Sequence, residues 1–189
     1  MANDSILNVL GISGSLRAKS FNSGALRAAQ DLAPDGMSIE IADISGVPLY
    51  NDDVEAEGMP DAVVQLRGQI AAADGLLIVT PEYNYSIPGV LKNAIDWASR
   101  PPEQPFDGKP MAIMGASPGG SGTMRCQYQL RQAFVFLNGL IMNRPEVMIS
   151  GAGALFDDDA HLTDQHTRER ISTCLESFAS WIRARQTPA

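Results

Sequence analysis

The chain has 189 residues, of which 44% are hydrophobic and 19% charged, and this favours one domain, residues 1–189, with a single well-buried core. Acidic residues outnumber basic ones by 22 to 14, the formal net charge is -8 at pH 7, and no run of Lys and Arg stands out. These charges argue against nucleic acid or an anionic membrane surface as a partner.

No segment predicts export or membrane insertion. Residues 1–12 lack a basic region followed by a long apolar stretch, and nowhere do about 18 apolar residues follow one another. Cys126 and Cys174 lie far apart, each in a stretch of helical spacing, which is typical of proteins in a reducing compartment. We therefore expect a cytoplasmic protein.

Short apolar runs recur along the chain, each followed by small or polar residues and then by a helical pattern. The runs predict five strands, at residues 6–12, 37–42, 75–80, 110–116 and 146–150. Most of them lack polar alternation, as in parallel strands covered on both faces. Apolar spacings of three and four predict helices near 22–32, 60–73, 90–98, 123–137 and 164–185. The alternation predicts an α/β fold with a doubly wound, five-stranded parallel sheet.

In such a sheet, ligands bind beyond the carboxyl ends of the strands, where the winding direction reverses. For the strand order 2-1-3-4-5, this point lies between the first and third strands. Three loops are expected to meet there: the first loop at residues 13–22, the second loop at 81–89 and the third loop at 117–122. The binding residues should therefore lie in these loops.

The first loop, SGSLRAKSFN, has the composition of an anion-binding loop. Ser15, Ser20 and Asn22 offer hydrogen bonds, and the helix that follows presents free N–H groups and its positive dipole end. Arg17 adds a planar fork of donors suited to phosphate oxygens. Because the Walker and G-x-G-x-x-G spacings and a cysteine nucleophile are absent, a mononucleotide phosphate suits the loop better than a pyrophosphate. Alternatively, Ser20 and Asn22 only cap the helix and Arg17 is a solvated charge.

The second loop carries aromatic residues and the third is rich in glycine. Tyr83 and Tyr85 follow a strand that must end at Thr80, because Pro81 cannot pair in a central strand. Flat side chains beside a phosphate site favour a planar ring on the same ligand, although loop tyrosines also pack on neighbouring helices or subunits. The third loop, SPGGSG, either allows close backbone approach to a ligand or is a plain flexible connection.

Other polar residues carry weaker signals. His161 and His166 lie in or near the most polar stretch, residues 155–167, away from the three loops and without the spacing of a metal site. The Asp157–Asp159 run lacks calcium-loop spacing and is expected to be a solvated turn. We find no Ser-His-Asp arrangement, and we predict neither a catalytic side chain nor a metal site.

Three segments, GSLRAKSFN, PEYNYSIPGVLKNAIDWASR and RCQYQLRQ, resemble the NADPH-dependent FMN reductase family, particularly its chromate and quinone reductases. The resemblance runs from Val9 to about Val147 and implies a flavodoxin-like fold that binds FMN non-covalently. Because Pro118 has no N–H, any backbone donor of the third loop must come from its neighbours. By motif, the phosphate would be held by Ser15, Arg17, Ser20 and Asn22; the flavin ring would be bordered by Pro81, Glu82, Tyr83 and Asn84, mainly through backbone groups, and on its other polar edge by Ser117 and Gly119.

The resemblance also implies the reaction and the assembly. NADPH or NADH would reduce the flavin, and a quinone, azo compound, flavin or metal oxyanion such as chromate would then take the electrons in a ping-pong cycle. Similar proteins are homodimers or homotetramers, and Arg125, Tyr128 and Gln132 lie on one predicted helix beside the subunit boundary. Two alternatives stay open: a flavodoxin-type electron carrier, which Arg17 and Lys19 disfavour, and a binding protein without flavin.

Overall fold

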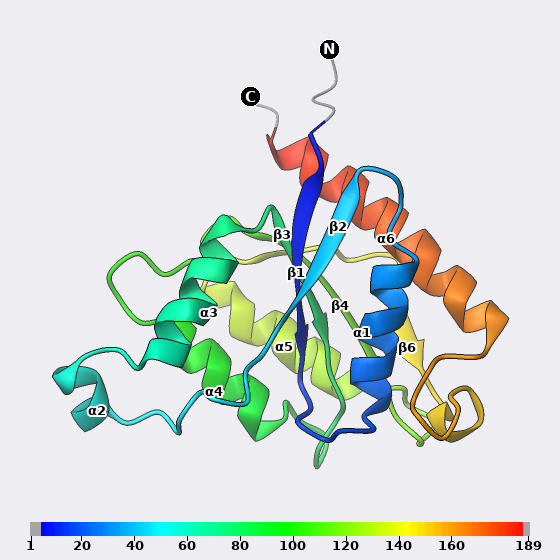
Figure 1. Cartoon of the computed structure of the whole chain (residues 1–189), viewed down its shortest axis with the longest axis horizontal. Helices are drawn as coiled ribbons and strands as arrows, with labels where there is room; N and C mark the ends of the chain where they lie inside the picture. The colour runs from blue at the N-terminus through cyan, green and yellow to red at the C-terminus, as the bar shows by residue number, and fades with distance from the viewer. Residues whose placement is uncertain (1–4, 187–189) are drawn as a thin grey trace.

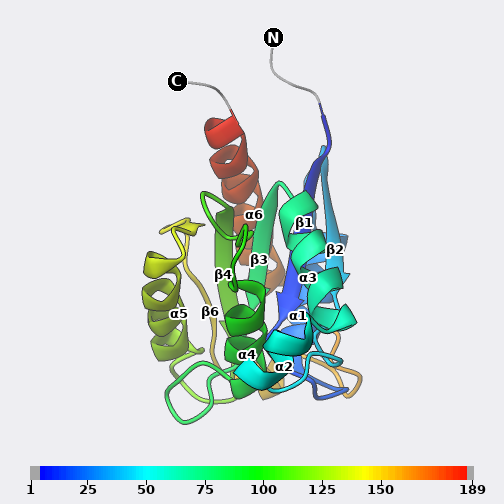
Figure 2. The same cartoon turned by 90° about the vertical axis from the view of Figure 1, so that its left-hand side faces the viewer.

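The computed structural model describes residues 5–186, and a parallel sheet with helices on both faces forms its centre (Figures 1 and 2). The strands are β1 (Leu7–Ser13), β2 (Met37–Ala42), β3 (Gly75–Val79), β4 (Pro110–Ala116), β5 (Leu140–Ile141) and β6 (Val147–Ile149). Their order is β2-β1-β3-β4-β5, β6 also pairs with β4, and every pair is parallel. The predicted doubly wound α/β fold and its strand order are confirmed.

Helices cover both faces of this sheet. They are α1 (Phe21–Asp31), α2 (Asp52–Glu57), α3 (Asp61–Ala72), α4 (Gly89–Ala98), α5 (Met124–Phe136) and α6 (Gln165–Gln186). Leu77 and Val79 of β3 pack in the core under α1 and α6, whereas Leu76 and Ile78 pack under α3, α4 and α5. Burial on both faces explains why the central strands show no polar alternation. Within residues 5–186, no helix combines the length and the apolar character that crossing a membrane requires.

Two elements differ from the sequence prediction. The expected fifth strand, at residues 146–150, is present as β6, which pairs with the last residues of β4, but the short strand β5, which pairs with the first residues of β4, was not expected. The two short strands do not join, because Pro145 between them lacks the N–H that a continuous strand would use. The Met142 carbonyl, also between them, accepts a hydrogen bond from Arg131 Nη2 at 3.1 Å. The spacing of apolar residues also failed to predict α2, because no residue of this helix is buried and no apolar stripe marks it.

A buried side chain joins the start of α1 to the end of β4. Asn22, only 3% exposed, donates from Nδ2 to the Ala116 carbonyl at 2.9 Å and accepts the Ala116 N–H through Oδ1 at 2.8 Å. Ser20 Oγ accepts the N–H groups of Asn22 and Ser23 at 3.2 and 3.4 Å, which fixes the start of the helix. This Asn22 clamp therefore sets how closely the first and third loops approach each other.

Replacing Asn22 with Ala should lower the free energy of unfolding by about 2–4 kcal/mol, because the buried N–H and carbonyl of Ala116 lose their partner. Urea unfolding followed by circular dichroism measures the change. As the matched control, Gln65→Ala removes an amide from an exposed position of α3 and should cost less than about 0.5 kcal/mol. Equal stabilities of the two variants would mean that the Asn22 clamp does not hold the loops.

Candidate functional site

The three loops meet at the carboxyl ends of β1, β3 and β4, at the lower edge of the molecule in Figure 1. Together they line a cavity of about 380 Å³, within the roughly 300–1,000 Å³ of small-molecule sites. Asn84 and Gly119 are not among its lining residues, whereas Phe21, Ala116 and Pro118, which were not among the predicted binding residues, complete its wall. The other predicted residues all line it: Ser15, Arg17, Ser20, Asn22, Pro81, Glu82, Tyr83 and Ser117.

The hydroxyl groups of the first loop are arranged as donors. Ser15 Oγ accepts the Arg17 N–H at 3.3 Å, and Ser20 Oγ accepts two N–H groups of α1. Because each oxygen already accepts a backbone donor, its own proton is available to an acceptor in the cavity. Both side chains are nearly buried, at 8% and 2% exposure, so their positions are set by the protein.

The two cations of the first loop differ in their surroundings. Arg17 makes no ion pair within residues 5–186, and its guanidinium lies over the Phe21 ring, 5.3 Å from the ring centroid. Lys19, in contrast, pairs with Asp159 at 3.1 Å. Arg17 therefore keeps its charge for a ligand at the amino end of α1, where the helix dipole also favours an anion.

The carboxylate of Glu82 is directed toward α5 and is only 8% exposed. Its Oε2 accepts the Cys126 N–H at 3.1 Å, and its Oε1 pairs with Arg125 Nη1 at 3.2 Å. The helix depends on this cap, because Thr123 precedes it with a φ of 71° and makes no side-chain cap bond. Arg125 also lies over the Tyr85 ring, 3.9 Å from its centroid. With its carboxylate engaged, Glu82 offers backbone groups to the cavity.

Residues 83–86 of the second loop form a tight hairpin turn. Tyr83 and Ser86 exchange N–H···O bonds of 3.1 and 2.9 Å, and Asn84 and Tyr85 have φ values of 50° and 65°, as in a type I′ turn. Gln129 of α5 donates to the Tyr85 carbonyl at 2.9 Å and accepts the Ser86 hydroxyl at 2.6 Å. The turn is thus held against α5, and the half-exposed Tyr83 is left at the rim of the cavity.

A fourth segment borders the first loop, which corrects the expectation that the polar stretch lies away from it. Residues 156–162 form a hairpin, hereafter the acidic hairpin, in which Ala160 O accepts Arg27 Nη2 at 3.1 Å. The Phe156 ring packs on Phe21 with 5.1 Å between centroids. This approach requires Gly24, where a Cβ would lie 2.0 Å from the Ala160 carbonyl oxygen. The one sequence signal for this contact is a glycine, Gly24, inside a predicted helix.

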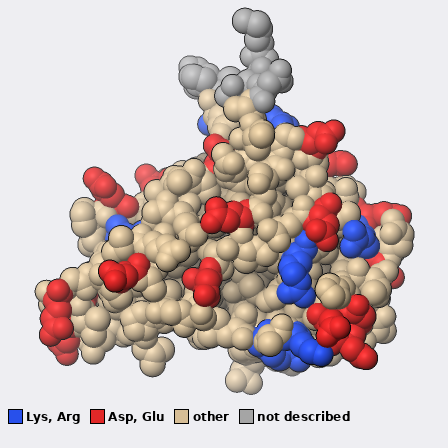
Figure 3. All heavy atoms as spheres, viewed as in Figure 1, with Lys and Arg blue, Asp and Glu red and all other residues tan. Residues whose placement is uncertain are grey.

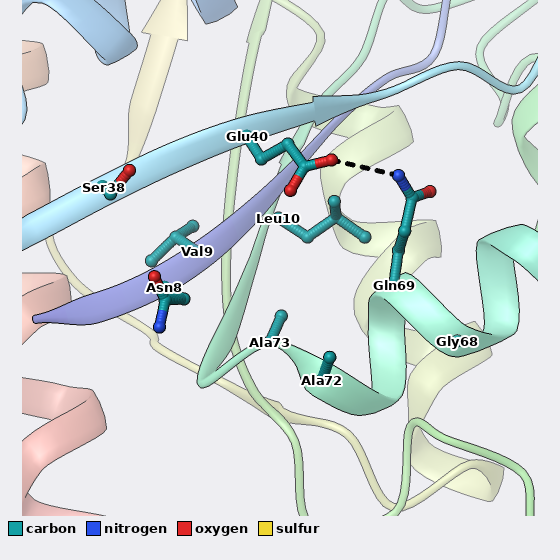
Figure 4. A pocket seen from close by; sticks show the side chains of 9 residues that line it. All are labelled: Asn8, Val9, Leu10, Ser38, Glu40, Gly68, Gln69, Ala72 and Ala73. Atoms are coloured by element: carbon teal, nitrogen blue, oxygen red, sulfur yellow. Dashed lines mark hydrogen bonds between the residues drawn. The ribbon is translucent and has the colours of Figure 1, made fainter.

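A larger cavity, of about 440 Å³, lies between β1, β2 and α3 (Figure 4). Asn8, near the amino end of β1, lines it, so this cavity is away from the carboxyl ends of the strands. Its carboxylate, Glu40, already accepts Gln69 Nε2 at 3.2 Å. Asn8 and Ser38 add only an uncharged amide and a hydroxyl, and within residues 5–186 the lining holds no cation and no amino end of a helix. This cavity therefore supports no comparable binding chemistry.

The thiol nearest the cavity is not activated. Cys126 is fully buried behind Thr80, with 3.7 Å between Sγ and Oγ1. Burial, with a smaller contribution from the Glu82 charge, raises its pKa to about 11. The thiol stays protonated at neutral pH and cannot serve as a nucleophile there.

Comparison with known proteins identifies the family. The model of the NADPH-dependent FMN reductases matches residues 7–154. An NAD(P)H-dependent FMN reductase of Pseudomonas aeruginosa is 62% identical over 177 residues, which cover 94% of this chain and 96% of that protein. A quinone reductase of Escherichia coli is 45% identical over 179 residues, which cover 93% and 95%. A solved structure of a flavoenzyme NAD(P)H:(acceptor) oxidoreductase from Paracoccus denitrificans is 35% identical with a TM-score of 0.86, and the match covers 95% and 99% of the two chains.

The chemistry of the cavity fits the cofactor of this family. Two serine hydroxyls, the guanidinium of Arg17 and the amino end of α1 suit a terminal phosphate, and the second loop presents backbone groups and an aromatic rim for a ring. The predicted family, its enzyme class and its cofactors, FMN with NAD(P)H as co-substrate, are confirmed by these matches. The chain belongs to the NADPH-dependent FMN reductase family.

Proposed function

We propose that this protein holds FMN in the cavity between the three loops, oxidises NADPH or NADH, and reduces quinones, azo compounds, free flavins or metal oxyanions such as chromate. The observation that carries the proposal is the convergence of Ser15, Arg17 and Ser20 with the backbone of the second loop on one cavity. The quinone reductase of Escherichia coli, 45% identical to this chain, supports quinones as one acceptor class.

The side chains would divide the work of binding. The hydroxyls of Ser15 and Ser20 and the guanidinium of Arg17 would bind the phosphate dianion with charge-assisted hydrogen bonds. In the third loop, the Ser117 N–H already donates to Ile149 O at 2.9 Å, so donors to the flavin would come from the glycine N–H groups that follow Pro118. Asn84, outside the cavity lining, would act through its loop conformation. The two-electron redox chemistry is supplied by FMN when it is bound.

The size of the cavity supports a ping-pong cycle. A cavity of about 380 Å³ is largely filled by one flavin-sized ligand, so NAD(P)H and the acceptor would use the remaining opening in turn. No side chain of the site is placed as an acid, base or nucleophile for a particular acceptor. Acceptors of different chemistry would therefore be reduced, provided that they reach the opening.

We propose that the protein is cytoplasmic and has a single domain. Cys126 and Cys174 are both free and buried, which fits a reducing compartment. One sheet carries both cores through residues 5–186, which supports one domain.

We further propose that α5 contacts a second copy of this chain in a homodimer or homotetramer. Tyr128 and Gln132, predicted for this contact, are exposed, but Arg125 is engaged by Glu82 and Tyr85 of its own chain. Apolar side chains add to the exposed surface of the helix, since Val135 and Phe136 are 77% and 93% exposed. Such patches mark interaction surfaces on soluble proteins.

Mixing the purified yellow protein with NADPH without oxygen tests the reductase. The flavin absorbance near about 450 nm should bleach rapidly and return when a quinone is added, as expected when bound FMN carries the electrons. Steady-state kinetics at several quinone concentrations should give parallel double-reciprocal lines. Colour that persists with NADPH and NADH would indicate an electron carrier, and a colourless protein that does not bind FMN would contradict the proposal.

Replacing Arg17 with Ala should weaken FMN binding by about 1.5–3 kcal/mol, because the phosphate loses a charge-assisted hydrogen bond. Fluorescence titration of the flavin-free protein measures this affinity. Riboflavin, which has no phosphate, should bind wild type and variant alike. Lys19→Gln is the matched control, and because Lys19 is exposed and paired with Asp159, it should change FMN binding by less than about 0.5 kcal/mol. Equal FMN affinity of Arg17→Ala and wild type would remove Arg17 from the phosphate site.

Replacing Phe136 with Glu should shift the protein toward monomers, because a charge would have to be buried in the contact. Sedimentation equilibrium at micromolar concentration measures the mass. Val64→Glu, at a position of α3 that is 54% exposed, is the control and should keep the wild-type mass. A monomeric wild type, or an unchanged mass of the Phe136 variant, would contradict the assigned surface.

A further inference from the structure

The acidic hairpin brings three consecutive carboxylates, Asp157 to Asp159, to the outer side of the first loop. Figure 3 shows the acidic cluster directly beside the basic side chains at the lower edge of the molecule. Asp157 Oδ1 accepts the N–H groups of Asp159 and His161 at 3.0 and 2.8 Å, and these bonds fix the tip of the hairpin. They also help to lower the pKa of Asp157, which therefore stays ionised at neutral pH.

A small cavity of about 240 Å³ separates the hairpin from the first loop. Arg17 and Phe21 line both this cavity and the main one, so they stand between the two. Asp157 and Asp158 line its far side. Lys19 also lines it, but its ammonium pairs with Asp159. A negative group in this cavity would have to share Arg17 with the first phosphate and would face the carboxylates of Asp157 and Asp158, while the charge of Lys19 is balanced by Asp159.

The opposite flank of the first loop is acidic as well. A cavity of about 330 Å³ there is lined by Ser15, Arg17 and Asp43. Hydrogen bonds from Ser45 lower the pKa of Asp43, so it is also ionised at neutral pH. The phosphate-binding groups are therefore bordered by carboxylates on both sides.

We propose that the acidic hairpin is a specificity determinant that makes the site select FMN over FAD. This inference rests on the proposed function, in which the phosphate of FMN is bound by Ser15, Arg17 and Ser20. FMN ends at this phosphate, whereas FAD continues with a second phosphate and adenosine, which must leave the first loop on one flank. The carboxylates of Asp157 and Asp158, which line the flanking cavity, disfavour that second phosphate, whereas Arg17, which lines both cavities, favours the first phosphate.

The test compares dissociation constants for FMN and FAD, measured by fluorescence titration of the flavin-free full chain at low salt. The variant Asp158→Asn with Asp159→Asn removes two exposed carboxylates and frees Lys19, and leaves the hydrogen-bonded Asp157 intact. The ratio of the FAD to the FMN dissociation constant should fall by about three- to ten-fold. At roughly 1 M salt, where the screening length is about 3 Å, the variant and wild type should converge.

A control with the same change of net charge separates local from general electrostatics. Asp31→Asn with Asp35→Asn neutralises two exposed carboxylates at the other end of α1, about 16 Å from its start, and should leave the ratio unchanged. Lys19→Gln should act in the opposite direction and raise the ratio, since the hairpin loses its counter-charge.

Each outcome has a separate meaning. Tight FMN binding with an unchanged ratio in the hairpin variant, or an equal fall in the Asp31/Asp35 control, would overturn the specificity role alone. A wild-type chain that binds neither flavin would instead contradict the proposed function.

Discussion

The paired hydrogen bonds between the Asn22 side chain and the Ala116 backbone are the constraint on which the site depends. They fix the start of α1 to the carboxyl end of β4, across the strand that carries the second loop. Without this link, the N–H groups and the guanidinium of the first loop would have no set distance from the second and third loops. A phosphate and a ring on one ligand could not then be held together.

Side-chain hydrogen bonds to backbone groups also fix the second loop. The polar atoms of Glu82 and Gln129 are hydrogen-bonded within the protein. The Glu82 carboxylate caps α5, and the Gln129 amide holds the turn at residues 83–86. The motif residues thus fall into two sets. Asn22 and Glu82 position backbone, whereas Ser15, Arg17 and Ser20 keep their donors for a ligand. Arg17, the one cation among the latter three, is flanked by the carboxylates of Asp43 on one side and of Asp157 and Asp158 on the other.

Much of this could be predicted from the sequence, because it depends on local patterns. Continuous apolar runs separated by helical spacing determine a doubly wound sheet, and the winding rule then places the three loops together. What could not be predicted depends on contacts between distant residues. Nothing in the run of residues 156–162 shows that Ala160 packs on Gly24, or that Phe156 stacks on Phe21. Likewise, the motif contains Glu82, but it does not show that the carboxylate turns toward α5.

The central claim is that the first loop binds a phosphate through Arg17 and the amino end of α1, and ³¹P nuclear magnetic resonance of the flavin-loaded protein tests it directly. A free phosphate monoester loses its second proton near about pH 6. Cationic donors favour the dianion and lower that pKa, so the bound resonance should not shift between about pH 5 and 9. A resonance that titrates near about pH 6, as in free FMN, would contradict the account.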